Sequence, residues 1–185
     1  MLSMPAAAMP RGDPEVPPLD IRPIDPGSQA EVDLVAHRMR LTLIEVEGEA
    51  TGTALYTIDW LRDRVRFHLD GAQCTGTVLL AEGRAGEVVG HTILRREQHE
   101  DGRAFGLVAT TYVDPAWRRR GIAERLLDAG EAWFRGQGLA EFATWTSATN
   151  APLVGLYRRH GYEITAEHIH DVTATRMVRL TRTEP

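Results

Sequence analysis

The most constraining feature of the sequence is a change of periodicity near the middle of the chain. Residues 105–113 are mostly apolar or small, as in a buried strand, and Asp114 and Pro115 end the run. Behind Gly121, apolar residues recur at helical spacing. A strand joined by a short loop to a helix predicts an α/β domain rather than an all-helical or all-β fold.

Strand and helix patterns continue along the rest of the chain, and two hairpins are implied by glycine-containing turns after residues 81 and 98. The first strand contains Pro23, so we expect it at an edge of the sheet. Strands are predicted at residues 20–24, 77–81, 88–94, 105–113, 139–145, 162–168 and 176–180. Helices are predicted at residues 28–46, 55–70, 121–138 and 150–160. The expected fold is a mixed sheet flanked by about four helices.

The length of 185 residues is sufficient for one hydrophobic core and too short for two full domains with a linker. Residues 1–18 hold half of the ten prolines and few apolar side chains, which predicts a disordered leader. We therefore expect a single domain at residues 19–185.

The basic side chains exclude several kinds of enzyme. All 21 are arginine, and the sequence contains no lysine. A phosphate-binding loop with its lysine, a pyridoxal Schiff base, a protein-kinase lysine and a Ser-x-x-Lys nucleophile are therefore excluded. The net charge of −5 argues against nucleic acid as a partner, because a nucleic-acid-binding surface needs a basic face.

The cysteine content bears on compartment and metal binding. Cys74 is the single cysteine, so an internal disulfide and a cysteine-based zinc site are excluded. No targeting segment or membrane span is evident, and we expect a cytoplasmic protein without a membrane partner. His168 and His170 share a strand face and could begin a metal site, but no further ligand cluster accompanies them. We therefore expect no metal.

Three arginines stand directly before the helix that begins near Gly121. Free backbone N–H groups at a helix N-terminus, together with glycine and guanidinium groups, form an anion site of the kind that holds a pyrophosphate. A solvated basic loop is the simpler interpretation of Arg118, Arg119 and Arg120. Cations at this end of a helix are electrostatically disfavoured, however, and this favours a bound anion.

Two sequence blocks resemble one enzyme family. Arg118-x-x-Gly121-x-Ala123 after a strand resembles the Arg/Gln-x-x-Gly-x-Gly/Ala signature of the GNAT N-acetyltransferase superfamily. The block from Asn150 to Tyr162, with Leu-Tyr at its centre, resembles the family's Asn-x-x-Ala-x-x-Leu-Tyr-x-x-x-Gly-Phe/Tyr block. The resemblance covers nearly the whole chain beyond the leader. It implies a mostly antiparallel central sheet in which splayed strands form an acyl-CoA groove.

The same resemblance implies acetyl-CoA as co-substrate and assigns residues to it. Asn150 would hold a pantetheine amide through its side chain, and the backbone groups of Tyr112 and Val113 would pair with the pantetheine like an added strand. Arg118 belongs to the same cofactor-binding set. The pyrophosphate would rest on the backbone amides of Arg119, Arg120, Gly121, Ile122 and Ala123.

The catalytic assignments are less complete. Tyr157 resembles the family's tyrosine near the departing sulfur and is the candidate general acid, although a helical tyrosine can simply pack in the core. Many family members carry a glutamate on the strand that corresponds to residues 105–113, where this chain has no carboxylate. The open candidates for the general base are His91, Glu97, His99, or water held by Thr110 and Thr111.

The resemblance implies an N-acetyltransferase that moves an acetyl group to a primary amine by direct attack in a ternary complex. The alternative is a catalytically idle acyl-CoA-binding or regulatory module of the same fold. The acceptor would be a small-molecule or peptide amine, and a homodimer is conceivable by analogy. Acidic residues of the first two helices could attract a cationic amine or could form solvated faces; they are Glu45, Glu47, Glu49, Asp59 and Asp63.

Overall fold

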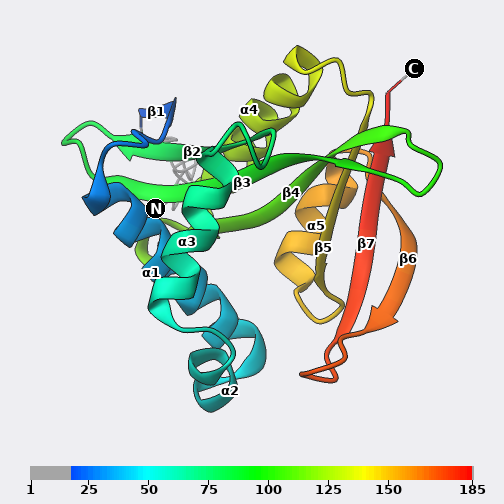
Figure 1. Cartoon of the computed structure of the whole chain (residues 1–185), viewed down its shortest axis with the longest axis horizontal. Helices are drawn as coiled ribbons and strands as arrows, with labels where there is room; N and C mark the ends of the chain where they lie inside the picture. The colour runs from blue at the N-terminus through cyan, green and yellow to red at the C-terminus, as the bar shows by residue number, and fades with distance from the viewer. Residues whose placement is uncertain (1–17, 185) are drawn as a thin grey trace, which may run out of the picture.

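A seven-stranded sheet forms the centre of the computed structural model, which describes residues 18–184 (Figure 1). The strand order is β1-β2-β3-β4-β5-β7-β6, and only the neighbours β4 and β5 are parallel. The strands are β1 (Leu19–Pro23), β2 (Gly76–Gly83), β3 (Val88–Gln98), β4 (Ala104–Val113), β5 (Glu141–Ser147), β6 (Glu163–Ile169) and β7 (Arg176–Thr183). The expected mixed, mostly antiparallel sheet is therefore confirmed, with the proline-containing strand β1 at one edge. The predicted leader lies almost wholly outside the described residues.

The helices agree with the sequence prediction except for one additional short helix. They are α1 (Gln29–Glu47), α2 (Glu49–Ala54), α3 (Ile58–Leu69), α4 (Ile122–Gly136) and α5 (Ala151–Arg159), with a 3-10 turn at Pro115–Trp117. The prediction treated the α2 segment as a break because it contains glycine and threonine. Gly48 ends α1 with a φ of 81°, and a Cβ on Gly52 would lie 2.5 Å from the backbone nitrogen of Ile44. Close packing of α2 against α1 thus requires the residue that weakens the helical pattern.

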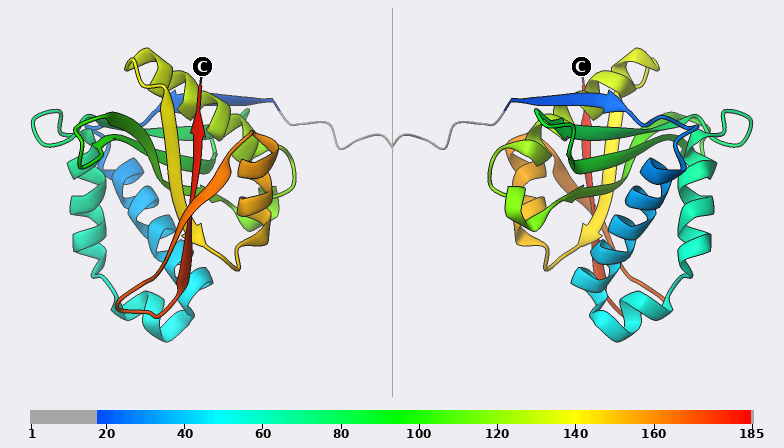
Figure 2. Two further views of the ribbon diagram at one scale, coloured as in Figure 1. Left: turned by 90° about the vertical axis from the view of Figure 1, so that its right-hand side faces the viewer. Right: turned by 90° about the vertical axis from the view of Figure 1, so that its left-hand side faces the viewer.

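The sheet has a separate apolar core on each face. Helices α1 and α3 pack through Val35, Leu61 and Val65 on one face, against Leu80 and Ile93 among others. Helices α4 and α5 cover the other face, where the core includes the residues Leu126, Phe134, Phe142, Leu156, Tyr157 and Leu180. Figure 2 shows α1 and α3 on the opposite side of the molecule from α5. The α3 face of β5, β7 and β6 carries no helix in the described part of the chain (Figure 1).

Strands β4 and β5 stay together over a short distance only. Their paired residues are Gly106 with Phe142, Leu107 with Ala143 and Val108 with Thr144, after which the strands diverge. We call this divergence beyond Val108 and Thr144 the β4–β5 fork. The register of β4 against β3 also shifts at this point, which leaves Ala109 as an extra, bulged residue. The splayed strands expected from the sequence are therefore present.

No helix within residues 18–184 is long and apolar enough to span a bilayer.

Close packing at the closed end of the fork makes Gly106 a sensitive position. A Cβ there would lie 2.4 Å from the Phe134 ring, which is fully buried. Gly106→Ala is expected to lower the free energy of unfolding by about 1–3 kcal/mol, because the ring cannot move without disturbing its neighbours. Urea unfolding followed by circular dichroism measures the effect.

Gly136→Ala is the matched control, since no atom lies within 4 Å of a Cβ at the last residue of α4. It should leave the free energy of unfolding unchanged or slightly higher. Equal stability of the two variants would contradict the packing argument.

Candidate functional site

The fork leaves one edge of β4 without a neighbouring strand. The backbone N–H of Asp114 donates to the Val89 carbonyl at 2.9 Å, so the backbone hydrogen-bonding groups of Asp114 are directed toward β3. Alternate residues of an antiparallel strand point to the same side, and Tyr112 therefore also directs its backbone groups to β3. Thr111 and Val113 direct theirs to the open edge. Tyr112 and Val113 are the residues predicted to pair with an extended ligand. At the open edge lie Thr111 and Val113 instead, and the Val113 carbonyl already accepts from Arg118 Nε.

The loop after β4 presents a row of unused backbone donors. Gly121 precedes α4 with a φ of 74°, and Arg119 also has a positive φ, 60°. The first helical bond runs from Arg125 N–H to the Gly121 carbonyl at 3.0 Å. Within residues 18–184, none of the backbone N–H groups from Arg119 to Glu124 has an acceptor. These donors lie at the positive end of the helix dipole, which is the arrangement that the predicted anion site requires.

The three arginines of this loop differ in what they contact. Arg118 is exposed but is tied to other parts of the protein: its Nε donates to the Val113 carbonyl at 2.9 Å and its Nη2 pairs with Glu45 of α1 at 2.6 Å. Arg119 and Arg120 are exposed and have no ion pair with a described residue. The guanidinium of Arg118 therefore fixes the loop, while those of Arg119 and Arg120 can meet an anion.

Tyr157 of α5 lies where the two strands separate. Its side chain is 2% exposed, and its hydroxyl faces the hydroxyls of Thr144 on β5 and Thr111 on β4. Burial raises the pKa of Tyr157 to about 12, and the hydrogen bonds to the two threonines oppose this shift. Thr144 in turn donates to the Val108 carbonyl at 2.9 Å, at the last pair of the fork. The tyrosine is thus a protonated donor within the fork at neutral pH.

Asn150 lies at the start of α5 and uses its side chain within the protein. Its Oδ1 accepts from Leu153 N–H at 3.3 Å as a helix cap, and its Nδ2 donates to Thr146 Oγ1 at 3.4 Å. The long distances leave both atoms able to exchange partners. Its predicted contact with a ligand amide stays a prediction.

His91 is a residue of β3, opposite Tyr112 of β4 and close to Arg38 of α1. It is fully buried, its ring stacks at 5.9 Å from that of Tyr112, and neither ring nitrogen has a hydrogen-bond partner among the described residues. Burial, with a smaller contribution from Arg38, lowers the pKa of His91 to about 3. The imidazole is therefore neutral but sealed from any substrate.

The other two candidate bases lie at the closed end of the fork. Glu97 is opposite Phe105 and pairs with Arg95, while His99 lies 3.0 Å from the Glu141 carboxylate. Six residues of strand separate Phe105 from Thr111, which corresponds to about 20 Å. Among the four alternatives, only water held by Thr110 and Thr111 is consistent with the position of the fork.

Of three further polar side chains, Arg38 lies at the site, whereas His168 and His170 lie elsewhere. Arg38 of α1 donates to the Val88 carbonyl and to Asp114, and no local signal in the sequence announces this contact, which joins residues 76 positions apart. His168 packs against Trp145, and His170 accepts from backbone N–H groups of its own turn. In the described residues, no three potential metal-ligating side chains come together.

Comparisons with known proteins agree with these features. The model of the Acetyltransferase (GNAT) family matches residues 53–162. The aminoglycoside N(6')-acetyltransferase type 1 of Klebsiella aerogenes is 33% identical over 93 residues, which are 49% of this chain and 61% of that protein. A mycothiol acetyltransferase of Pseudarthrobacter chlorophenolicus is 28% identical over 160 residues, 86% of this chain and 45% of that protein. The chain thus spans less than two thirds of either relative.

Solved structures show the same fold at low sequence identity. A GNAT family acetyltransferase from Streptococcus pneumoniae superposes with a TM-score of 0.68 at 19% identity, covering 91% of this chain and all (100%) of that one. A GNAT family acetyltransferase from Elizabethkingia anophelis with acetyl-CoA bound superposes with a TM-score of 0.61 at 16% identity, covering 89% of this chain and 97% of that one.

Two buried histidines make the fold sensitive to mild acid. Burial lowers the pKa of His91 to about 3 and that of His68 to about 4, against about 6.5 in the unfolded chain. Below pH 6.5 the unfolded chain therefore binds protons that the folded chain does not, and stability falls as the pH falls. Each histidine contributes a slope of up to about 1.4 kcal/mol per pH unit.

Urea unfolding between pH 7 and pH 5 measures this slope, in a range where the carboxylates stay ionised. His91→Gln should remove about half of it, and the exposed His37→Gln should change nothing. A slope that is the same in both variants would show that His91 takes up its proton in the folded state.

Proposed function

The chain belongs to the GNAT acetyltransferase family, and we propose that it transfers an acetyl group from acetyl-CoA to a primary amine by direct attack in a ternary complex. We assign this activity to one domain, residues 19–185. One observation carries the proposal: three features follow one another from the fork to the start of α4. They are the buried Tyr157 hydroxyl, the free edge of β4 and the unused amides before α4.

These features fit the parts of acetyl-CoA. The pantetheine arm would extend along the free edge of β4 and pair with the backbone groups of Thr111 and with the Val113 N–H, since the Val113 carbonyl accepts from Arg118. The pyrophosphate would accept hydrogen bonds from the amides of Arg119 to Ala123. Because the chain has no lysine, any further charge on the phosphates must be met by guanidinium groups, and Arg119 and Arg120 are free to do so.

When bound, acetyl-CoA supplies a thioester whose carbonyl carbon the amine attacks, so that the C–N bond forms and the C–S electron pair leaves on sulfur. Tyr157 would donate a hydrogen bond to that sulfur. A thiol has an ordinary pKa of about 8.5, well below the value of about 12 for the Tyr157 hydroxyl. Full proton transfer from the tyrosine is therefore uphill, and we assign Tyr157 the stabilisation of developing charge rather than complete protonation.

The proton of the attacking amine needs another acceptor. His91 is fully buried, and Glu97 and His99 lie at the closed end of the fork. Water beside the exposed edge of Thr111 is the remaining route, and an amine that arrives deprotonated would reduce the demand on it. The named relatives act on different compounds, so they do not define the acceptor of this chain.

The first test concerns the anion site. Wild-type protein should bind acetyl-CoA in calorimetry, and Gly121→Glu should weaken binding at least about 100-fold. The substitution strains a backbone with positive φ and places a carboxylate among the amide donors.

Gly102→Glu is the matched control: it imposes the same strain and charge at a glycine with a φ of 83° in the β3–β4 turn. Its affinity for acetyl-CoA should equal that of the wild type. The proposal fails if the wild type does not bind acetyl-CoA or if Gly121→Glu binds it normally.

The second test concerns Tyr157. Tyr157→Phe should lower kcat by roughly 10- to 100-fold, the loss of one hydrogen bond to a developing charge, while the affinity for acetyl-CoA stays the same. Release of the CoA thiol reports kcat, and calorimetry reports the affinity.

Tyr162→Phe serves as the comparison, because the two rings pack at 4.9 Å but the Tyr162 hydroxyl donates to buried Glu131. It should reduce stability and leave kcat unchanged at a temperature where the variant is folded. Equal kcat values for wild type and Tyr157→Phe would remove the assigned role.

The second candidate function is an acyl-CoA-binding or regulatory module without catalysis. The lack of a carboxylate on β4 favours it. Binding of acetyl-CoA without thiol release above background, across a broad panel of amines, would support this alternative over the enzyme.

A further inference from the structure

A polar pocket lies on the α3 face of the sheet, separate from the anion site predicted in the loop that precedes α4. Its volume is about 260 Å³, and it lies between α3, the α3–β2 loop and β3. Three of the lining residues are arginines and one is acidic. The lining residues that matter here are Arg64, Phe67, Cys74, Arg95, Arg96 and Glu97.

The positive charges of this pocket are not balanced within residues 18–184. Arg95 pairs with Glu97, but Arg64 and Arg96 have no ion pair and no side-chain hydrogen bond with a described residue. The guanidinium of Arg64 instead lies 4.6 Å from the centre of the Phe67 ring. Burial and the neighbouring Arg95 lower the pKa of Arg64, so its charge is held at a cost that a bound anion would relieve.

The acidic residues that could attract a cationic acceptor are mostly occupied. Glu45 pairs with Arg118, and Glu47 accepts a hydrogen bond from Thr175 at 2.6 Å. On α3 the carboxylates bind arginines of their own helix, Asp59 with Arg62 and Asp63 with Arg66. The unbalanced charge near the sheet is therefore positive.

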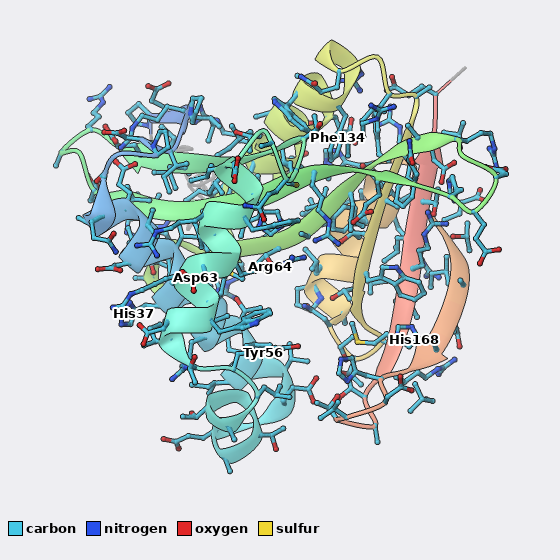
Figure 3. All side chains as sticks on the ribbon, in the orientation of Figure 1. His37, Tyr56, Asp63, Arg64, Phe134 and His168 are labelled. Carbon is cyan, nitrogen blue, oxygen red and sulfur yellow. The ribbon has the colours of Figure 1, made fainter. Side chains whose placement is uncertain are left out.

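The pocket lies close to the fork and on its accessible side. Arg95 is opposite Leu107, which is opposite Ala143 in the middle of the three β4–β5 pairs. One strand spacing and two residues along β4 separate Arg95 from the bulged Ala109, about 8 Å between Cα atoms. Helices α4 and α5 cover the other face, so an acceptor must approach from the α3 side. Figure 3 shows Tyr56 and Arg64 on this side, with His168 of β6 across from them.

We propose that this pocket binds the carboxylate of the acceptor through Arg64, and that the acceptor is a small amine bearing a carboxylate, such as an α-amino acid. The inference rests on the proposed function and narrows its substrate class. With the carboxylate on the Arg64 guanidinium, the amine of the acceptor would point along β4 toward the fork.

Matched acceptors test the proposal kinetically. Each α-amino acid of a panel is compared with its C-terminal amide by release of the CoA thiol. The acids should have a kcat/KM at least about 10-fold higher than the amides in the wild type. Arg64→Ala should raise KM for the acids roughly 10- to 100-fold, and leave KM for the amides and the affinity for acetyl-CoA unchanged.

Two further variants separate charge from structure. Arg64→Lys keeps the charge and should recover part of the preference for acids. Arg66→Ala, two residues along α3 and paired with Asp63, should behave as the wild type. Equal kcat/KM for acids and amides in the wild type, or an equal loss for both in Arg64→Ala, would overturn the inference.

Calorimetry provides a readout that does not depend on turnover. Titrated into the protein saturated with CoA, an α-amino acid should bind the wild type but not Arg64→Ala. The matching amide should bind equally weakly to both.

Sodium acetate and inorganic phosphate are the remaining probes. If either binds as tightly as the amino acids do, the pocket is a general anion site and the acceptor assignment is overturned. If the wild type binds acetyl-CoA and acetylates only amines without a carboxylate, the inference fails and the proposed function stands. If acetyl-CoA does not bind, the proposed function itself fails.

Discussion

The short contact between β4 and β5 is the constraint on which the candidate site depends. Parallel strands normally pair along their length, but here three residue pairs hold the two strands before they separate. Close packing at the closed end, where Gly106 lies against Phe134, allows the pairs to form. The bulge at Ala109 and the buried Tyr157 then lie at the point of separation. In a continuous ladder, the backbone groups of Thr111 and Val113 would bond to β5. They would then be unable to pair with an extended ligand.

Long-range arginine contacts hold the parts of the site relative to one another. Arg38, in the middle of α1, contacts Val88 and Asp114, the residue after β4. Arg118 connects the loop before α4 to Glu45 near the C-terminal end of α1. Guanidinium groups suit this task because one side chain can bind a carbonyl and a carboxylate at once. Because the sequence contains no lysine, arginine makes these contacts, and in the proposed function it would also bind the phosphates.

On helices α1 and α3, packing decides which charged side chains remain unpaired, and this differs from what the composition of the two helices suggests. The sequence of α1 and α3 contains many acidic residues and suggests a site for a cation. In the folded chain most of these carboxylates bind arginines or a threonine, whereas Arg64 has no such partner among the described residues. The sign of the local field is therefore set by which charges remain unpaired, and not by which are more numerous.

Local patterns alone determined the secondary structure except for α2, the mixed sheet, the loop that presents amides before α4 and the place of Tyr157 on a helix. These features depend on residues near in sequence, such as Gly121 and the apolar positions of α4. Local patterns missed α2, because Gly52 is unfavourable in a helix until α1 packs against it. Only the tertiary structure decided that Thr111 and not Tyr112 faces the open edge, and that His91 is fully buried. It also decided that Glu97 and His99 lie at the closed end of the fork. Strand register, burial and the pairing of charges join residues far apart in the chain, so no local pattern contains them.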